Sequence, residues 1–302
     1  MPQDERSVSP SQKLSIVIGS VESARSIERC LDALVVSCAG IDCEIVVVNA
    51  GQDPAVESAT AKISNARYLP MPDDSLTPRL WSEGIASSSG DVVALITAHC
   101  MVTRPWARGL LDALDEGPAA AGGPLSLADD ASLVDAAIFF LRYSAFLIGR
   151  GNSAVDEIAG DNAAYIRDRI PQGSWSREKG FWETDVNRAI RRDGGAIVWR
   201  DDAVAEFTHS FRFATICRHR FEHGRLFGAA RVSERGESKA RIILASPLVP
   251  FMLAVRIGRR LIRAGRYRMR YLVALPLVLP LAACWAFGEA TGAMDGSVAH
   301  RS

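Results

Sequence analysis

The stretch from Gly90 to Cys100 constrains the fold more than any other part of the sequence. Five apolar residues, Val92–Ile96, follow a Ser-Gly-Asp turn, and three of them are β-branched. A run of this length and composition is typical of a strand that is buried on both faces. It ends in the small polar residues Thr97, His99 and Cys100. In open α/β sheets, ligands bind beyond the carboxyl ends of the strands, so we expect these groups to face a ligand.

The chain before this stretch alternates between strand and helix. Buried strands are predicted over 14–19 and 43–49, and a shorter one over 66–70. Asp53 followed by Pro54 is a favourable helix start. After the first strand, a helix is predicted from the spacing of Ile27, Cys30, Leu31 and Leu34. A second helix is predicted over residues 77–87, directly before the Gly90 turn. Three to four such units predict an α/β fold with a mostly parallel sheet and helices on both faces.

The composition provides an ample core, and the charge is unevenly distributed. Apolar residues make up 48% of the 302 residues, which is enough for one large domain or two smaller ones. The net charge is zero, but residues 212–270 contain fifteen basic residues and three glutamates, which gives this segment a charge of +12. Such a segment indicates an anionic partner, either a membrane or a nucleic acid.

The six cysteines and the N-terminus bear on the compartment. The cysteines are scattered without metal-site spacing, which favours free thiols in a reducing compartment. Residues 1–12 are polar and are expected to form a disordered leader rather than a cleaved signal peptide. Four lysines against 31 arginines indicate a GC-rich bacterial genome.

Several ordered segments together resemble one protein family. Residues 44–51 form a strand and turn, Pro78 and Arg79 open the helix before the Gly90 strand, and a helix with Trp106 follows. Later segments agree with the same pattern, namely Gly160–Arg167, Phe181–Ile190 with Gly194, and Phe221–Arg225. From about Leu14 to Arg231, the chain resembles a family 2 glycosyltransferase of GT-A fold.

The resemblance implies transfer of a sugar from a nucleotide diphosphate to an acceptor hydroxyl, with inversion. This reaction needs a base for the acceptor proton and a positive centre for the departing diphosphate. Glu183 falls on the position of the family's base, and Asp185 follows two residues later. Residues two apart on a helix point to different faces, so one of them acts as base, and we expect it to be Glu183. Without the resemblance, both would be first-turn acids favoured by the helix dipole.

The expected metal site departs from the family pattern. The family usually has Asp-x-Asp after the fourth strand to hold Mg²⁺ or Mn²⁺, whereas this chain has Thr97, Ala98 and His99. His99 either ligates Mn²⁺ or hydrogen-bonds the diphosphate, and both readings remain open. His209 is a second candidate ligand, with a structural histidine as the alternative.

The nucleotide and acceptor sites are also assigned from the resemblance. Asn49 stands where the family commonly has an aspartate that accepts the imide N–H of the base, and an amide oxygen can still accept it. Further residues of the nucleotide-sugar site are Gly19, Ser20, Glu22, Gly51 and Arg79, beside Thr97, Ala98 and His99. Glu22 and Arg79 could equally be solvated surface groups. Asn162, Trp175 and Trp182 are the acceptor-side candidates, and the two tryptophans either stack on a sugar or pack in the core.

The C-terminal third predicts association with a membrane. Apolar runs over 242–255 and 271–287 contain fourteen and seventeen residues, and prolines interrupt both. A helix that spans a bilayer needs about 20 apolar residues. Seven arginines lie between the runs, and the positive-inside rule would place a hairpin's loop in the cytoplasm and the catalytic domain outside, away from nucleotide sugars. We therefore expect re-entrant or interfacial helices on the cytoplasmic face of the inner membrane, peripheral or monotopic, with a hairpin as second choice. The apolar helix over 131–148 could belong to the core, but a lipid-facing wall agrees better with the predicted membrane association.

The sequence thus predicts a disordered leader (1–12), a GT-A domain (13–231) and an Arg-rich, apolar, membrane-associating helical region (232–302). The expected function is an inverting glycosyltransferase with a lipid or lipid-linked glycan acceptor, in cell-envelope polysaccharide or glycolipid biosynthesis. The alternative is a degenerate relative that binds a nucleotide or glycan, or serves as a scaffold, without turnover. Residues 49, 97 and 99 favour the alternative, and the Glu183 helix favours the enzyme. Nucleic-acid binding is excluded, because the arginines flank proline-broken apolar runs with few aromatic residues for stacking bases.

Overall fold

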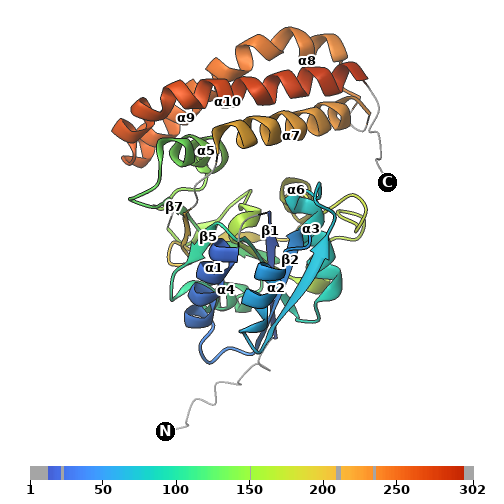
Figure 1. Cartoon of the computed structure of the whole chain (residues 1–302), viewed down its shortest axis with the longest axis vertical. Helices are drawn as coiled ribbons and strands as arrows, with labels where there is room; N and C mark the ends of the chain where they lie inside the picture. The colour runs from blue at the N-terminus through green and yellow to red at the C-terminus, as the bar shows by residue number, and fades with distance from the viewer. Residues whose placement is uncertain (1–12, 22–23, 150, 209–211, 234–235, 296–302) are drawn as a thin grey trace. The chain divides into compact units, whose positions relative to one another are not determined.

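A computed structural model describes residues 13–21, 24–149, 151–208, 212–233 and 236–295. The predicted disordered leader, residues 1–12, lies outside the described residues. The chain divides into two compact units (Figure 1). The first, here the sheet unit, comprises Met1–Ser126 and Phe146–Phe207, and the second, here the helical unit, comprises Leu127–Ala145 and Thr208–Ser302.

An eight-stranded sheet forms the centre of the sheet unit. Its strands, in spatial order, are β3 (Ala66–Met71), β2 (Cys43–Ala50), β1 (Leu14–Ser20), β4 (Val92–Thr97), β9 (Ala163–Ile166), β6 (Ala120–Gly122), β10 (Ile197–Trp199) and β8 (Ser153–Ala154). Strands β3, β2, β1 and β4 are parallel, as the sequence predicts. Strand β9 runs antiparallel between β4 and β6, and β8 is an antiparallel edge strand beside β10. The sheet is therefore mixed, and its first half is parallel.

A second, three-stranded sheet begins directly after β4. It contains β5 (Cys100–Val102), β11 (Ala205–Phe207) and β7 (Leu125–Leu127), with β11 in the middle. Strands β5 and β11 pair antiparallel, with Cys100 opposite Phe207. This pairing brings residues near position 205 to the carboxyl end of β4.

The helices of the sheet unit bury the faces that their apolar spacing predicts. They are α1 (Ala24–Ser37), α2 (Pro54–Ala61), α3 (Thr77–Ser87), α4 (Trp106–Asp115) and α6 (Glu183–Arg192), with short 3₁₀ turns η1 (Gly160–Asn162) and η2 (Arg167–Arg169). Asp53 caps α2 by accepting a hydrogen bond from the Ala55 amide at 2.9 Å. Helix α3 approaches the sheet so closely that a Cβ at Gly84 would lie 2.2 Å from Val17 Cγ1. Only glycine permits this packing.

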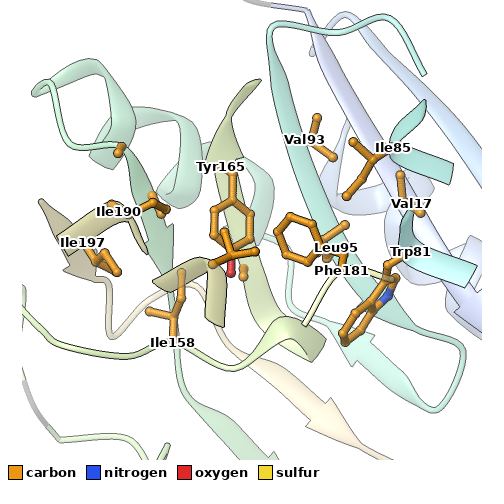
Figure 2. Packing of buried hydrophobic residues seen from close by; sticks show 14 of the residues in the cluster. Val17, Trp81, Ile85, Val93, Leu95, Ile158, Tyr165, Phe181, Ile190 and Ile197 are labelled. Atoms are coloured by element: carbon orange, nitrogen blue, oxygen red, sulfur yellow. The ribbon is translucent and has the colours of Figure 1, made fainter. Parts of the chain in front are cut away.

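The core beneath the parallel strands joins α3, β9 and the segment before α6 (Figure 2). Val17, Val93 and Leu95 from the sheet share one cluster with Trp81 and Phe181. The Trp81 indole N–H donates to the carbonyl of Ile96 at 3.0 Å. A buried tryptophan with its polar atom satisfied is a rigid anchor, and here it holds the carboxyl end of β4 in place.

The helical unit is built around one long helix. Helix α10 (Arg268–Asp295) packs against α7 (Phe213–Ser233), α5 (Leu133–Tyr143) and α9 (Val249–Ala264), and also contacts α8 (Lys239–Ala245) and η3 (Ser246–Leu248) (Figure 1). Two continuous helical segments, Lys239–Ala264 and Arg268–Asp295, are long and apolar enough to cross a membrane, with 26 and 28 residues. Both continue through the prolines, and both exceed the apolar runs seen in the sequence because they extend into flanking residues that include arginines.

Glycines place α7 and α10 in backbone contact. A Cβ at Gly224 would lie 2.2 Å from the Trp285 carbonyl oxygen, and one at Gly228 would lie 2.1 Å from that of Glu289. Gly288 and Gly292 of α10 are equally close to backbone atoms of α7. Glycines four residues apart on both helices are typical of helix pairs in membranes, where small residues let backbones approach.

Helix α5 corrects the expectation of a lipid-facing wall over 131–148. The helix is shorter than predicted, and Phe139, Phe140 and Tyr143 are at most 2% exposed. Phe140 packs edge-to-face on Tyr271 of α10 with ring centroids 5.3 Å apart. These side chains therefore form the core of the helical unit. Because α5 and α7 pack with α10, this unit is larger than the predicted region 232–302.

The apolar surface lies on other helices of this unit. Large apolar side chains of α8, η3, α9 and α10 with more than half of their area exposed are Leu244, Leu248, Phe251, Met252, Val255, Ile262, Met269, Leu272, Val273, Phe287 and Met294. We call this set the apolar surface of the helical unit. Exposed apolar side chains in this number are typical of a surface that contacts a membrane or another protein.

Candidate functional site

Three neighbouring strands end together at the edge of the parallel sheet. In the strand register, Gly19 lies opposite Thr97, and Ser20 lies opposite Asn49. The Ala98 amide donates to the Gly19 carbonyl at 3.3 Å, which ties the turn after β4 to the end of β1. The structure thus brings together Gly19, Ser20, Asn49, Thr97 and Ala98 from the predicted nucleotide-sugar site, as the parallel order of the strands requires.

Asn49 presents an acceptor that no neighbour uses. Its side-chain nitrogen donates to the carbonyls of Ala50 and Gly51, both at 3.2 Å. Its Oδ1 is buried and has no hydrogen-bond partner among the residues that the structure describes. A buried polar atom without a partner is uncommon and calls for an explanation. An imide or amide N–H of a ligand would satisfy it.

Gly51 turns the chain beside an acidic side chain that the sequence interpretation missed. Its φ is +94°, and a Cβ would lie 2.9 Å from Asp73 Oδ1, so this position requires glycine. The Tyr68 hydroxyl donates to the Gly51 carbonyl at 3.2 Å. Asp73 comes from the exposed loop after β3, and nothing in its local sequence distinguishes it from a surface acid.

A buried polar cluster lies beyond β4. The Thr97 hydroxyl donates to Asp161 Oδ1 at 2.7 Å and lies 3.0 Å from His99 Nε2. The distance from His99 Nε2 to Asp161 Oδ1 is 3.8 Å, and both side chains are at most 5% exposed. Phe207 packs edge-on against the His99 ring at 5.1 Å. The sequence interpretation named Asn162 and missed Asp161, which lies 64 residues from Thr97 along the chain.

This cluster has the donors for a metal ion. One ligand atom each from His99, Cys100 and Asp161 lie within 4.8 Å of one another. An imidazole, a thiol and a carboxylate suit a borderline transition ion better than Mg²⁺, which prefers oxygen ligands. The residues therefore fit a divalent ion such as Mn²⁺ or a softer one. His209, the second predicted ligand, lies outside the described residues.

Glu183 is the first residue of α6 and lies beside η1. A Cβ at Gly160 would be 3.3 Å from Glu183 Cβ and 2.6 Å from Trp81 Cζ3, so glycine is needed where η1 passes these two side chains. The pKa of the Tyr165 hydroxyl is raised well above its usual value, first by complete burial and then by the charge of Glu183. Gly160 directly precedes Asp161, so Glu183 lies beside the turn that carries Asp161 of the polar cluster.

Asp185 occupies another face of α6. It forms an ion pair with Arg188 at 2.9 Å, one turn along the helix, and its side chain is 46% exposed. The two acids of this helix thus differ in surroundings, as their spacing predicts. Glu183 lies beside Gly160 of η1, the turn that carries Asp161, whereas Asp185 pairs with Arg188.

The three acceptor-side candidates differ in their contacts. Asn162 is fully buried, and its amide is engaged by Trp106 at 2.7 Å and by the carbonyls of Pro124 and Ala203. This saturated amide has a structural role, which corrects the expectation that it contacts an acceptor. Trp175 packs against Phe181 in the core, with ring centroids 6.0 Å apart.

Trp182 and Arg79 lie nearer the surface. The Trp182 indole donates to the Lys179 carbonyl at 2.9 Å, directly before α6 begins. Arg79 is exposed in the first turn of α3. Glu22 lies outside the described residues.

Comparisons with known proteins agree with this geometry. The family model described as glycosyl transferase family 2 matches residues 15–168, about half of the chain. A solved mannosyltransferase from Pyrobaculum calidifontis, in complex with GDP-mannose and Mn²⁺, has a TM-score of 0.52 at 15% identity. The match covers 97% of this chain and 77% of that one. No curated protein matches. The structural likeness confirms the predicted GT-A fold.

Proposed function

Because the chain belongs to glycosyltransferase family 2, we propose that it transfers a sugar from a nucleotide diphosphate to an acceptor hydroxyl with inversion, and that Glu183 is the base. The observation that carries this proposal is the position of Glu183 beside Gly160, in the turn that carries Asp161 of the polar cluster. A base must reach the acceptor proton while the diphosphate departs on the other side of the sugar.

The strand ends supply groups for the donor. The unpartnered Oδ1 of Asn49 accepts an N–H of the nucleobase, at the position where the family commonly has aspartate. His99, Asp161 and Cys100 would hold a divalent ion, which supplies positive charge for the departing diphosphate. Gly19, Ser20 and Gly51 let the nucleotide approach the backbone. Arg79, exposed in the first turn of α3, would add a cation for the diphosphate.

We propose further that the acceptor is a lipid or a lipid-linked glycan at the cytoplasmic face of the membrane. The apolar surface of the helical unit and the arginines on either side of the junction between its two long helical segments support this part of the proposal. Arginines beside apolar helices interact with anionic headgroups while the apolar faces enter the bilayer.

The test compares Glu183→Gln with Asp185→Asn in donor binding and in transfer or donor hydrolysis. Removing a general base should lower the rate by about 100- to 10,000-fold. Glu183→Gln should therefore abolish most turnover while thermal stabilisation by the nucleotide sugar remains, and Asp185→Asn should retain activity. A wild-type protein that binds a donor without turning it over would favour the degenerate relative. An active Glu183→Gln would contradict the assignment of the base.

The metal assignment has a separate test. A screen of nucleotide sugars with and without Mn²⁺ should show a larger rise in melting temperature when the ion is present, because the ion and the diphosphate bind together. His99→Gln should remove this difference and leave stabilisation by the free nucleoside unchanged. Equal stabilisation with and without the ion would show that His99 serves the diphosphate without a metal.

A further inference from the structure

Two cysteines lie on either side of the turn that connects α1 to β2. Cys38 directly follows the last residue of α1 and is 7% exposed, and Cys43 is the first residue of β2 and is partly exposed. The amide of Ile41 donates to the Cys38 carbonyl at 3.0 Å and closes the turn. The Cys38 thiol donates a hydrogen bond to the Cys43 sulfur. The turn thus brings two sulfur atoms into direct contact, and neither is part of a disulfide in this structure.

Asn65, in the connection between α2 and β3, holds Cys43 in place. Its side-chain nitrogen donates to the Cys43 carbonyl at 2.8 Å and to the Cys43 sulfur at 3.3 Å. Its own carbonyl accepts from the Ile45 amide at 2.9 Å, so this connection is tied to β2 at two points. The Cys43 sulfur therefore accepts from two groups, the Cys38 thiol and the Asn65 amide.

These two donors make Cys43 the more acidic of the two thiols. The hydrogen bond from Cys38 lowers the pKa of Cys43, burial raises it, the bond from Asn65 lowers it and the charge of Asp42 raises it, with a net change from 9.0 to about 7. The same bond with Cys43, and then burial, raise the pKa of Cys38 above its ordinary value. Hydrogen bonds to a thiolate stabilise the charged form, and the thiolate is the reactive form of cysteine. At neutral pH, Cys43 is therefore the nucleophile, and Cys38 stays protonated beside it.

We propose that Cys38 and Cys43 form a redox-modification site, which a low-molecular-weight disulfide such as oxidised glutathione converts to an intramolecular disulfide. The Cys43 thiolate attacks one sulfur of the small disulfide, the other sulfur leaves as a thiolate, and a mixed disulfide results. Cys38 loses its proton as its sulfur attacks that of Cys43, which releases the second small thiol. The two cysteines are oxidised, and the small disulfide is reduced to two thiols that take up the two protons.

The turn between the two cysteines is able to adjust to the bond that forms. The sulfur atoms of a disulfide lie about 2.0 Å apart, closer than those of two thiols that share a hydrogen bond. Gly40 lies in this turn with φ of +76°, and a Cβ there would meet nothing within 4 Å. Because nothing packs against this position, the exposed turn is free to shift as the sulfur atoms approach each other.

The pair is separate from the proposed nucleotide-sugar site. Cys43 begins β2, whereas Asn49 is next to the last residue of this strand. At about 3.3 Å per residue, the two positions are roughly 20 Å apart along the strand. The proposal therefore goes beyond the proposed function, and its test does not depend on transferase activity.

A second pair of thiols provides a control within the same chain. Cys217 of α7 and Cys284 of α10, both in the helical unit, also share a hydrogen bond. Burial, and then this bond, raise the pKa of Cys217 to about 11. This pair has the contact between thiols but lacks the acidic thiol. Comparing the two pairs thus separates the effect of proximity from that of the thiolate.

The test incubates the full chain at pH 7 with oxidised glutathione, blocks the remaining thiols with iodoacetamide and locates each disulfide by mass spectrometry. In the wild type, Cys38 and Cys43 should become joined about tenfold to a hundredfold faster than Cys217 and Cys284, because more of Cys43 is ionised. Cys38→Ser should stop at the mixed disulfide on Cys43. Cys43→Ser should leave Cys38 unmodified, because that thiol is buried and protonated.

Two results would overturn the proposal. If the wild type accumulates the mixed disulfide as Cys38→Ser does, Cys38 does not reach the sulfur of Cys43. If both pairs are oxidised at the same rate, the surroundings of Cys43 confer no reactivity. Both measurements use the wild type, so a variant that fails to fold leaves the test intact. The rate of alkylation of Cys43 against pH is an independent check, because a midpoint near 7 supports the assignment and one near 9.0 contradicts it.

Discussion

At the scale of single residues, the side chain of Glu44 shows how the sheet is joined to the turn before β4. Glu44 accepts hydrogen bonds from the amide and the hydroxyl of Ser89, at 2.7 and 2.9 Å, and from the Ser15 hydroxyl at 2.8 Å. The partly buried carboxylate also lies near Lys13 and Arg67. It therefore links β1, β2 and the Ser89 turn, and so helps to place the strand that carries Thr97.

The same contacts predict how stability depends on pH. Burial raises the pKa of Glu44, but the hydrogen bonds from Ser89 and Ser15 together outweigh this effect. The pKa is therefore lowered from 4.5 to about 2. A depressed pKa stabilises the folded state above the unfolded value of 4.5, and this contribution is lost as the pH falls toward 2. Between pH 4.5 and pH 2, the free energy of unfolding of the wild type should thus fall by about 2 kcal/mol more than that of Glu44→Gln. Urea unfolding at each pH measures it, and parallel curves for the two proteins would contradict the prediction.

At the scale of secondary structure, the pair α7–α10 depends on its glycines. The contacts of Gly224, Gly228, Gly288 and Gly292 are with backbone atoms, which cannot rotate away as a side chain can. Close backbone approach also permits Cα–H···O contacts between the helices. This pair is therefore sensitive to the addition of a single methyl group.

Gly228→Ala should separate the two helices and destabilise the helical unit by about 1–3 kcal/mol, the usual cost of overpacking. Its control is Gly258→Ala in α9, where a Cβ would meet only Tyr271 Cε1 at an ordinary 3.5 Å. Alanine is the better helix former, so the control should be stabilised by up to about 1 kcal/mol. Thermal melting in a mild detergent measures both, and equal melting temperatures would contradict the close packing.

At the scale of the whole molecule, the two units differ in surface. In the two candidate spans of the helical unit only 17% and 39% of the most apolar window is buried, whereas β1 and β4 of the sheet unit are buried throughout. The apolar residues of the first unit thus serve its own core. Many of those in the second unit are exposed.

The double substitution Phe251→Glu with Met252→Glu should weaken vesicle binding by about tenfold or more, because both side chains are more than half exposed and would lose their burial in lipid. Val36→Glu is the control, because Val36 is 56% exposed on α1 of the sheet unit. Donor binding should remain unchanged in both proteins. If the double variant floats with vesicles as the wild type does, this face does not contact the membrane.

The parallel half of the sheet and its helices could be predicted because their patterns are long and local. Strands β1, β2 and β4 are apolar runs that end in turns, and the spacing of Ile27, Leu31 and Leu34 is helical. Strand β9 has four residues, too few for a periodic pattern, and its antiparallel pairing with β4 depends on contacts far along the chain. Likewise, the apolar sequence of helix α5 is equally compatible with a helix that faces lipid and with one buried in a core.

The sequence by itself determined the family, the GT-A fold and the strand ends that carry Asn49, Thr97 and His99, because those features lie in continuous segments with a fixed period. Only the tertiary structure decided which groups meet there. Asp161 joins Thr97 because β9 pairs with β4, and Asn162, its neighbour, is saturated by backbone carbonyls. Arg220 lies over Trp285 because glycines bring α7 against α10. Such contacts join residues that are far apart in the sequence and depend on how helices and strands pack. Local periodicity in the sequence does not encode this packing.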